Sequence, residues 1–220
     1  MRYKAVLFDL DGTLLDTLED LAHACNRVRA GLNLPPHPLD AYRLFVGDGA
    51  RKLVERMLPE TMREFDAVEA ALVAFRQEYA ACWQAHSRPY PGIAEMLDAL
   101  TAGGLRLGVL SNKPDFFTKL FVSTLLGRWP FAPVLGQREG VPKKPDPAGA
   151  LEAARLMSVS PAETLFVGDS GVDMATAKAA GMTAVGVLWG FRGADELKAN
   201  GADALAAEPG DILRFAQLAG

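Results

Sequence analysis

The stretch VLFDLDGTLLDT, residues 6–17, places Asp9 and Asp11 two positions apart at the end of an apolar run. A short apolar run that stops at a glycine turn is typical of a buried strand. Because side chains two residues apart in an extended segment face the same side, both carboxylates can address one ligand. Taken alone, the acidic pair fits a strand-end turn at Gly12 just as well. The stretch therefore predicts a strand with an acidic end.

Three further apolar runs have the same form, and each is followed by a turn and then by a segment with helical spacing. They are LRLGVLSN (105–112), TLFVGD (164–169) and TAVGVLWG (183–190). Strands that alternate with helices predict a parallel sheet covered on both faces, which is an α/β fold with a Rossmann-like three-layer core. Residues 194–213 predict a last helix, a short strand and a closing helix.

The alternation breaks between residues 15 and 86, where no strand is predicted and only helical spacing is present. An all-helical block inside an α/β chain indicates an inserted helical cap domain, here residues 15–87, in a core formed by residues 1–14 and 88–220. We expect the cap to move as a lid about hinges at residues 14–17 and 87–92. Prolines and a glycine turn separate the predicted helices, which cover residues 17–30, 40–45, 50–58 and 64–84.

Composition excludes several classes of function. Half of the 220 residues are apolar, which is enough for a substantial core, and the net charge of −4 includes no basic tract. Nucleic acid is therefore not an expected partner. No apolar run approaches the roughly 20 residues that cross a bilayer, and there is no signal-peptide pattern. We expect a cytoplasmic protein without a membrane partner, monomeric or homodimeric, whose Cys25 and Cys82 are buried reduced thiols.

Polar side chains follow the predicted strands at their carboxyl ends. Ser111 and Asn112 end the second run, Asp169 ends the third, and Asp173 lies four residues beyond it. Ligands of open parallel sheets bind outside the carboxyl ends of the strands, so these side chains and Asp9 should converge at one site. Ser111 and Asn112, and likewise Asp169 or Ser170, could instead cap the helix that follows, which is a common role for these residue types.

A cluster of carboxylates requires a cation. Two unit charges about 4 Å apart repel by roughly 4 kcal/mol at an effective dielectric near 20. Oxygen ligands without His or Cys favour Mg²⁺, which keeps water and phosphate oxygens in its shell. A lysine of the KKPDP segment, Lys143 or Lys144, suggests a phosphate ligand, and backbone amides near Gly12 and Thr13 could cradle its oxygens.

Four motifs in order resemble those of the haloacid dehalogenase superfamily of phosphohydrolases. DLDGTLLD resembles its first motif, SNK its second, KPDP its third and GDSGVDMATAKAAG its fourth. The resemblance spans residues 4–181 and implies an α/β core with a helical cap. Any one motif alone would be weak, whereas four at the ends of predicted strands fit one mechanism.

The resemblance implies a Mg²⁺-dependent phosphomonoesterase. Asp9 would attack phosphorus to give an aspartyl-phosphate, and Asp11 would protonate the leaving alcohol and then deprotonate water. Mg²⁺ would be held by Asp9, the backbone carbonyl of Asp11, and Asp169, with Asp173 in support. Lys144, which directly precedes Pro145, is preferred to Lys143. The residues expected to bind the phosphoryl group are Gly12, Thr13, Ser111, Asn112 and Lys144.

The cap segment FVGDGARKLVERML, residues 45–58, resembles that of phosphoglycolate phosphatases. This implies 2-phosphoglycolate or a similar small phosphorylated metabolite as substrate, and a role in carbohydrate metabolism. Amides at the start of the predicted helix could bind a substrate carboxylate. The residues expected to set specificity are Gly47, Asp48, Gly49 and Arg51, with Arg43 as the alternative source of positive charge; Arg51 could equally belong to a solvated helix face.

Several other functions remain open from the sequence. A sugar phosphomutase like β-phosphoglucomutase shares Asp9 and Asp11 but returns the phosphoryl group to a sugar. A phosphonatase needs a cap lysine, for which Lys52 is available. From a different class, a non-catalytic signalling module phosphorylated on Asp9 would bind phosphate analogues without hydrolysing esters, yet it would need neither a cap nor an acid at Asp11.

Overall fold

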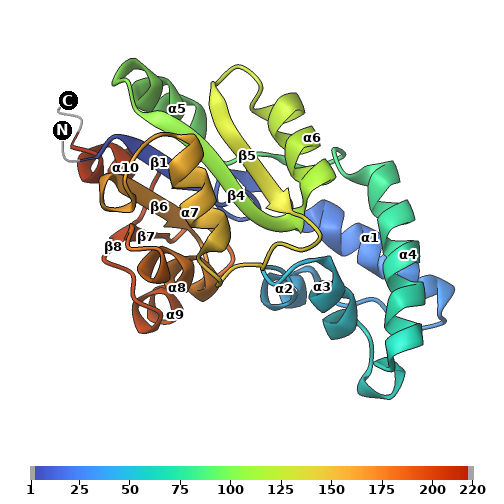
Figure 1. The fold of residues 1–220 in the computed structure, drawn as a ribbon. Coiled ribbons are helices and arrows are strands. Elements are labelled where there is room, and N and C mark those ends of the chain that lie inside the picture. Colours follow the sequence, from blue (N-terminus) through green and yellow to red (C-terminus); the bar gives the residue numbers. More distant parts are fainter. Residues whose placement is uncertain (1–2, 218–220) are drawn as a thin grey trace. The chain divides into compact units, whose positions relative to one another are not determined.

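A central parallel sheet organises the chain in the computed structural model, which describes residues 3–217 (Figure 1). Among these residues the sheet has six strands in the order β5-β4-β1-β6-β7-β8. β1 therefore lies between β4 and β6, and its carboxyl end opens between theirs. The bounds are β1 (Ala5–Phe8), β4 (Arg106–Pro114), β5 (Phe131–Gln137), β6 (Thr164–Gly168), β7 (Thr183–Val187) and β8 (Ala204–Ala206).

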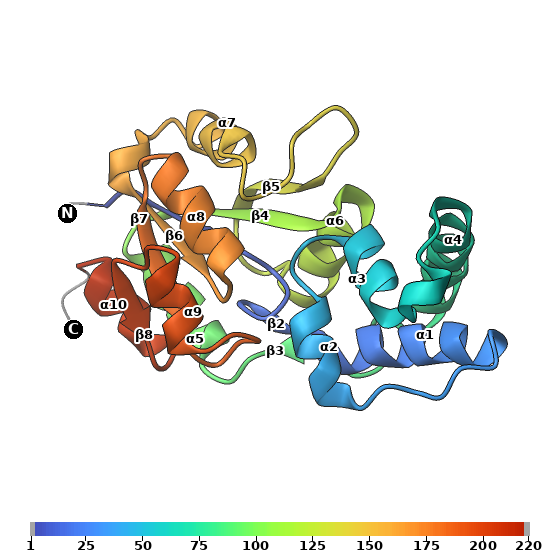
Figure 2. The same ribbon diagram turned by 90° about the horizontal axis from the view of Figure 1, so that it is seen from below.

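Helices cover both faces of the sheet and confirm the predicted three-layer α/β core (Figure 2). α7 (Ala148–Leu156), α8 (Gly171–Ala179) and α9 (Ala194–Ala199) pack on one face, where Leu7 and Phe166 contribute to a shared hydrophobic cluster. α5 (Ile93–Ala102), α6 (Asp115–Leu125) and α10 (Gly210–Phe215) cover the other. β1 is completely buried on both faces, which explains its uninterrupted apolar run.

The C-terminal elements of the core were predicted from the apolar pattern, whereas strand β5 was not. The closing order α9, β8, α10 confirms the prediction for residues 194–213. β5 was not predicted, because its sequence FAPVLGQ contains Pro133 and several of its side chains are only partly buried. Proline is tolerated on an edge strand, and β5 is at the edge of the sheet.

Asp16–Arg88 form a second compact unit, and residues 3–15 and 89–217 belong to the first. These bounds lie one residue from those predicted for the cap. Its helices begin and end within two residues of the predicted positions: α1 (Leu18–Gly31), α2 (Leu39–Phe45), α3 (Ala50–Met57) and α4 (Phe65–Cys82), with a 3₁₀ turn at Glu60–Met62. The buried side chains at its centre include Tyr42, Val54, Met57 and Phe75.

The expectation that residues 15–86 contain no strand was wrong. β2 (Leu15–Asp16) pairs with β3 (Arg88–Pro89), so a two-stranded ribbon joins the segments that enter and leave the cap unit. Strands of two residues are too short to show an alternating pattern, and the sequence could not indicate them.

Two expectations from composition can be compared with the structure. Among residues 3–217, no helix combines the length and apolar character needed to span a membrane. Both cysteines are reduced, but only Cys25 is buried; Cys82 is half-buried, so the expectation of two buried thiols was correct for Cys25 alone.

Candidate active site

Asp9 stands at the carboxyl end of β1, with its side chain buried. Its backbone N–H donates to the carbonyl of Val167 at 2.9 Å, which continues the pairing of β1 with β6. Nζ of Lys144 lies 2.8 Å from Oδ1 of Asp9 and 2.6 Å from Oδ1 of Asp173. Lys144 also donates to the carbonyl of Leu110 at 3.1 Å. A single buried lysine thus lies between two buried carboxylates.

The charges of this cluster do not balance. Burial raises the pKa of Asp9 to about 7, and the charge of Asp173 adds to this effect while Lys144 opposes it. Burial, with the charges of Asp173 and Asp9, raises the pKa of Asp169 well above its usual range. Burial would lower the pKa of Lys144, but the two aspartates outweigh burial and raise it. The site therefore favours further positive charge.

Asp169 follows β6 and is held from two sides. The N–H of Phe191 donates to its Oδ2 at 2.8 Å, and the hydroxyl of Thr13 donates to its Oδ1 at 3.4 Å. Gly12 passes so close that a Cβ built on it would lie 2.3 Å from Oδ2 of Asp169, and its φ of +86° also favours glycine. The backbone after β1 thus approaches Asp169 where no side chain would fit.

Asp173 joins the start of α8 to the site. The backbone and hydroxyl of Ser170 donate to its Oδ2 at 3.0 and 2.6 Å, forming a reciprocal capping box. Its Oδ1 accepts the hydrogen bond from Lys144. Both oxygens are therefore in use, which suits a supporting position in the cluster. Helix capping, the alternative given above for Asp169 or Ser170, is present at Ser170, and the role of Asp173 toward a metal ion remains a prediction.

Lys113 is the main residue that the sequence interpretation missed. Its Nζ lies 3.0 and 3.2 Å from the two carboxylate oxygens of Asp11 and 4.2 Å from the centroid of the Phe121 ring. The side chain is almost completely buried. It directly follows Ser111 and Asn112 in the SNK motif, but a lysine after a polar strand end gives no indication of burial.

Other predicted phosphate-binding residues make contacts of their own. Oδ1 of Asn112 accepts from the N–H of Lys144 at 2.9 Å, and its Nδ2 donates to the Lys144 carbonyl at 3.1 Å. The hydroxyl of Ser111 accepts from the N–H of Lys113 at 3.2 Å. The N–H of Gly12 donates to Leu15 at 2.8 Å. These residues lie around the cluster, and their roles toward a phosphoryl group remain predictions.

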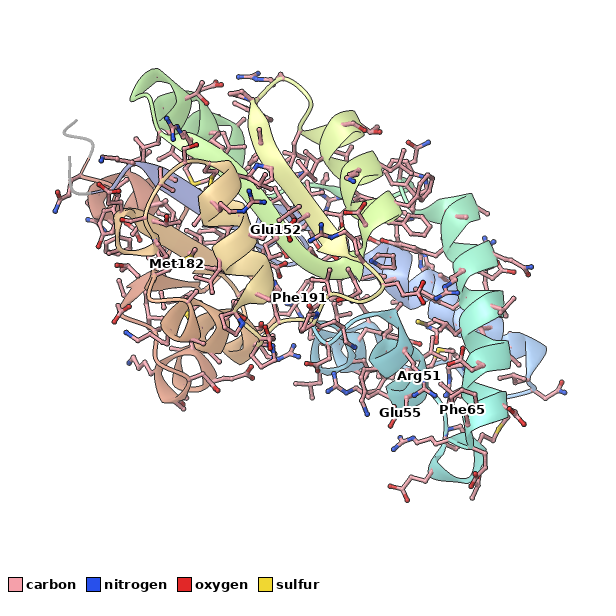
Figure 3. The ribbon with its side chains drawn as sticks, viewed as in Figure 1. Arg51, Glu55, Phe65, Glu152, Met182 and Phe191 are labelled. Carbon is pink, nitrogen blue, oxygen red and sulfur yellow. The ribbon has the colours of Figure 1, made fainter. Side chains whose placement is uncertain are left out.

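The loop after β7 also reaches the site, which the sequence did not indicate. Phe191, labelled in Figure 3, follows Gly190 in this loop. A Cβ built on Gly190 would lie 2.3 Å from Cβ of Asp169 and 2.4 Å from the carbonyl oxygen of Gly12. The Nε1–H of Trp189 donates to the carbonyl of Thr13 at 2.9 Å. The loop therefore fixes the segment after β1.

Substituting Gly190 with alanine tests this packing. We expect Gly190→Ala to lower the free energy of unfolding by about 1–3 kcal/mol, because the methyl group must displace Asp169 or Gly12, and to lower activity as well. Gly193→Ala in the same loop is the matched control, since a Cβ there meets nothing within 4 Å. Urea unfolding and phosphate release measure the two effects. Equal stability and equal activity of the two variants would contradict the close packing of Gly190 against Asp169 and Gly12.

The predicted specificity loop lies in the cap unit. Gly47 and Gly49 have φ values of 121° and 89°, and Gly49 precedes the first residue of α3. Asp48 pairs with Arg56 at 2.5 Å, which balances its charge. The glycines thus give the loop a backbone that other residues rarely adopt.

Arg51 and Arg43 have partners within the cap unit. Nε of Arg51 lies 2.9 Å from Oε1 of Glu69, its Nη1 lies 3.9 Å from Glu55, and its guanidinium lies over the ring of Phe65 (Figure 3). Arg43 pairs with Asp40 at 3.4 Å. Arg51 thus bridges α3 and α4, and a substrate contact by either arginine remains a prediction.

The cluster fits a hard divalent cation. Asp9, Asp169 and Asp173 are all buried and offer oxygen atoms within 4.8 Å of one another. Lys144 contacts two of these three carboxylates, and Oδ1 of Asp9 has no well-aligned hydrogen bond within the described residues despite its contact with Lys144. Oxygen donors with excess negative charge are the ligands that Mg²⁺ prefers.

The fold is a Rossmann-like α/β core with an acidic site at the carboxyl ends of β1, β4 and β6, and the sequence comparison identifies its family. Residues 3–181 match the haloacid dehalogenase-like hydrolase family. The chain belongs to this family and is a phosphatase. The resemblance indicated by the four motifs is thereby confirmed.

Known proteins of high similarity point the same way. A phosphoglycolate phosphatase of Pseudomonas putida is 37% identical over 195 residues, which cover 86% of this chain and 70% of the relative. One from Thiobacillus denitrificans is 36% identical, with 86% and 84% covered. A solved structure from Lactobacillus delbrueckii subsp. bulgaricus, named as a candidate phosphoglycolate phosphatase, has a TM-score of 0.90 and 28% identity, and covers 98% of this chain and 99% of its own.

Proposed function

We propose that this phosphatase hydrolyses small phosphomonoesters through an aspartyl-phosphate on Asp9. The observation that carries the proposal is the pairing of Asp9 and Asp11 with separate buried lysines, Lys144 and Lys113. The two carboxylates are close enough for the charge of Asp11 to contribute to the raised pKa of Asp9. A nucleophile, a second carboxyl group and two cations are thus assembled around one position.

The proposed chemistry proceeds in two displacements. An oxygen of the Asp9 carboxylate forms a bond to phosphorus while the bond from phosphorus to the alcohol oxygen breaks, and Asp11 gives that oxygen a proton. A water molecule then attacks phosphorus, Asp11 takes its proton, and the bond to Asp9 breaks to release phosphate. We infer that the bound phosphoryl group takes over Lys113, which frees Asp11 to exchange protons.

The cation belongs to the same proposal. Asp9 and Asp169 would hold Mg²⁺, together with the backbone carbonyl of Asp11, and Asp173 would support them through Lys144. When bound, Mg²⁺ would neutralise charge on the phosphoryl oxygens. Side chains and backbone groups position the two aspartates: Lys144 keeps Asp9 in place, and Thr13 and Phe191 fix Asp169.

We further propose 2-phosphoglycolate as the substrate. The names of the curated relatives support this choice, as does the Gly47–Asp48–Gly49 loop ahead of α3 in the cap. The test is phosphate release with Mg²⁺ from a panel of esters that includes 2-phosphoglycolate and phosphohexoses. If another ester is hydrolysed and 2-phosphoglycolate is not, 2-phosphoglycolate is rejected as the substrate. Interconversion of phosphohexoses without release of free phosphate would indicate a mutase.

Binding of Mg²⁺ should depend on pH. Because burial raises the pKa of Asp9 to about 7, a proton occupies this carboxyl at lower pH and competes with the cation. We expect the apparent affinity for Mg²⁺ to rise by about tenfold per pH unit or more between pH 5.5 and 7, because the raised pKa of Asp169 adds a second proton that competes with the cation. Isothermal titration calorimetry at a series of pH values measures this. A constant affinity over the range would contradict the assignment of Asp9 as a ligand.

A further inference from the structure

A second group of metal-binding side chains lies in the cap unit, apart from the carboxylate cluster. Glu19, His23 and His86 offer ligand atoms within 4.8 Å of one another. Nδ1 of His86 lies 3.4 Å from Oε1 of Glu19, and the rings of His23 and His86 have centroids 5.2 Å apart at 76°. The three side chains come from two segments that are more than 60 residues apart in the sequence.

The backbone fixes the positions of all three residues relative to one another. Glu19 and His23 are four residues apart on α1, so they share one face of the helix. The position of His86 is fixed by Asp20, whose buried carboxylate accepts hydrogen bonds from the N–H of His86 at 3.0 and 3.1 Å. The N–H and hydroxyl of Ser87 donate to the same carboxylate at 2.8 and 2.7 Å. Asp20 therefore anchors the segment that carries His86 against the first turn of α1.

The ligand set differs in kind from that of the catalytic cluster. Two imidazoles and one carboxylate suit Zn²⁺, Co²⁺ or Ni²⁺ rather than Mg²⁺, which prefers oxygen alone. Ligands about 2.1 Å from a tetrahedral ion lie roughly 3.4 Å from one another. The pair formed by His86 and Glu19 already has this spacing. His23 is exposed, so its ring can rotate to complete the set.

We infer that Glu19, His23 and His86 form a second metal site, specific for a borderline transition-metal ion such as Zn²⁺. Three protein ligands would leave at least one coordination position for water. The ion would join the first turn of α1 to the residues just before β3, at the two ends of the cap unit. It would therefore tie together the segments through which the chain enters and leaves that unit.

The three histidines of the chain give this proposal a direct test. Zn²⁺ is titrated into the 220-residue protein in excess Mg²⁺, added to compete for the proposed Mg²⁺ site at the carboxylate cluster, while imidazole resonances are followed by NMR. We expect the resonances of His23 and His86 to shift together and saturably. His37 is the internal control, because it lies outside the cluster with its Nε2 3.0 Å from the carbonyl oxygen of Met57.

Variants test the same ligands independently. We expect His23→Gln and His86→Gln each to weaken Zn²⁺ binding at least about tenfold, and Glu19→Gln to do so as well. All three side chains are at least partly exposed, so glutamine should not disturb folding. His37→Gln should bind Zn²⁺ as the wild type does. The proposal is overturned if the His23 and His86 resonances do not move, or if the cluster variants keep wild-type affinity.

Discussion

Replacing Asp9 with asparagine is expected to lower kcat for phosphate release roughly 10⁴- to 10⁶-fold, because the amide cannot form the bond to phosphorus. The loss should occur without loss of stability. Asp9 is a buried carboxyl whose pKa burial raises to about 7, so removing its charge relieves repulsion with Asp169 and Asp173. We expect Asp9→Asn without Mg²⁺ to melt at or above the wild-type temperature at pH 8.

A second variant separates the two carboxyl roles. Asp11→Asn should slow hydrolysis strongly for an alkyl phosphate, whose leaving oxygen needs a proton. For an aryl phosphate with an acidic leaving group, it should slow the first displacement much less. Rapid-quench measurements of the first turnover compare the two esters. Full turnover by Asp9→Asn, or equal losses with both esters for Asp11→Asn, would count against the proposed mechanism.

Replacing Lys144 with methionine should destabilise the protein by about 3–5 kcal/mol at pH 8 and abolish turnover, because buried carboxylates then lose their cation. The buried Lys144 side chain contacts Asp9, Asp173 and the carbonyl of Leu110. The matched control is Lys143→Met, since Lys143 is the exposed neighbour in the same segment. It should stay close to the wild type in both stability and turnover.

The pH dependence of the Lys144 variant gives an independent check. When the pKa of a buried carboxyl is higher in the folded than in the unfolded state, the folded state binds more protons between these two pKa values. Stability therefore falls as pH rises through the interval between them. For Asp9 in the wild type the interval extends from 3.8 to about 7. Removing Lys144 removes an opposing charge and should widen the interval, so the loss of stability should be smaller at pH 5.5 than at pH 8. Urea unfolding at both pH values tests this, and an equal loss would be inconsistent with it.

The parts of the fold that the sequence predicted are those whose own residues carry the pattern. β1, β6 and β7 are apolar along their length because helices cover both faces, and the cap helices have clear breaks between them. β5 was missed because its residues reflect an edge position, and β2 and β3 because each has only two residues. These strands form because of the strands that they pair with, and their own residues do not show a strand pattern.

The candidate site divides in the same way. The positions of Asp9, Asp169 and Lys144 could be predicted because strand ends and a motif placed them together. Lys113 and Gly190 could not, since burial of a lysine and close approach of a glycine depend on packing with distant residues. A glycine between an aromatic pair, as in Trp189–Gly190–Phe191, is a weak signal that could direct attention to such a loop.

Asp173 serves two elements at once, and this limits how the protein can change. One of its oxygens closes the first turn of α8, and the other holds the lysine beside the proposed nucleophile. A substitution that alters how α8 begins will therefore also move a charge at the reaction centre. Neither property can be optimised separately during evolution or design, because a single side chain couples the folding of a helix to the rate of the reaction.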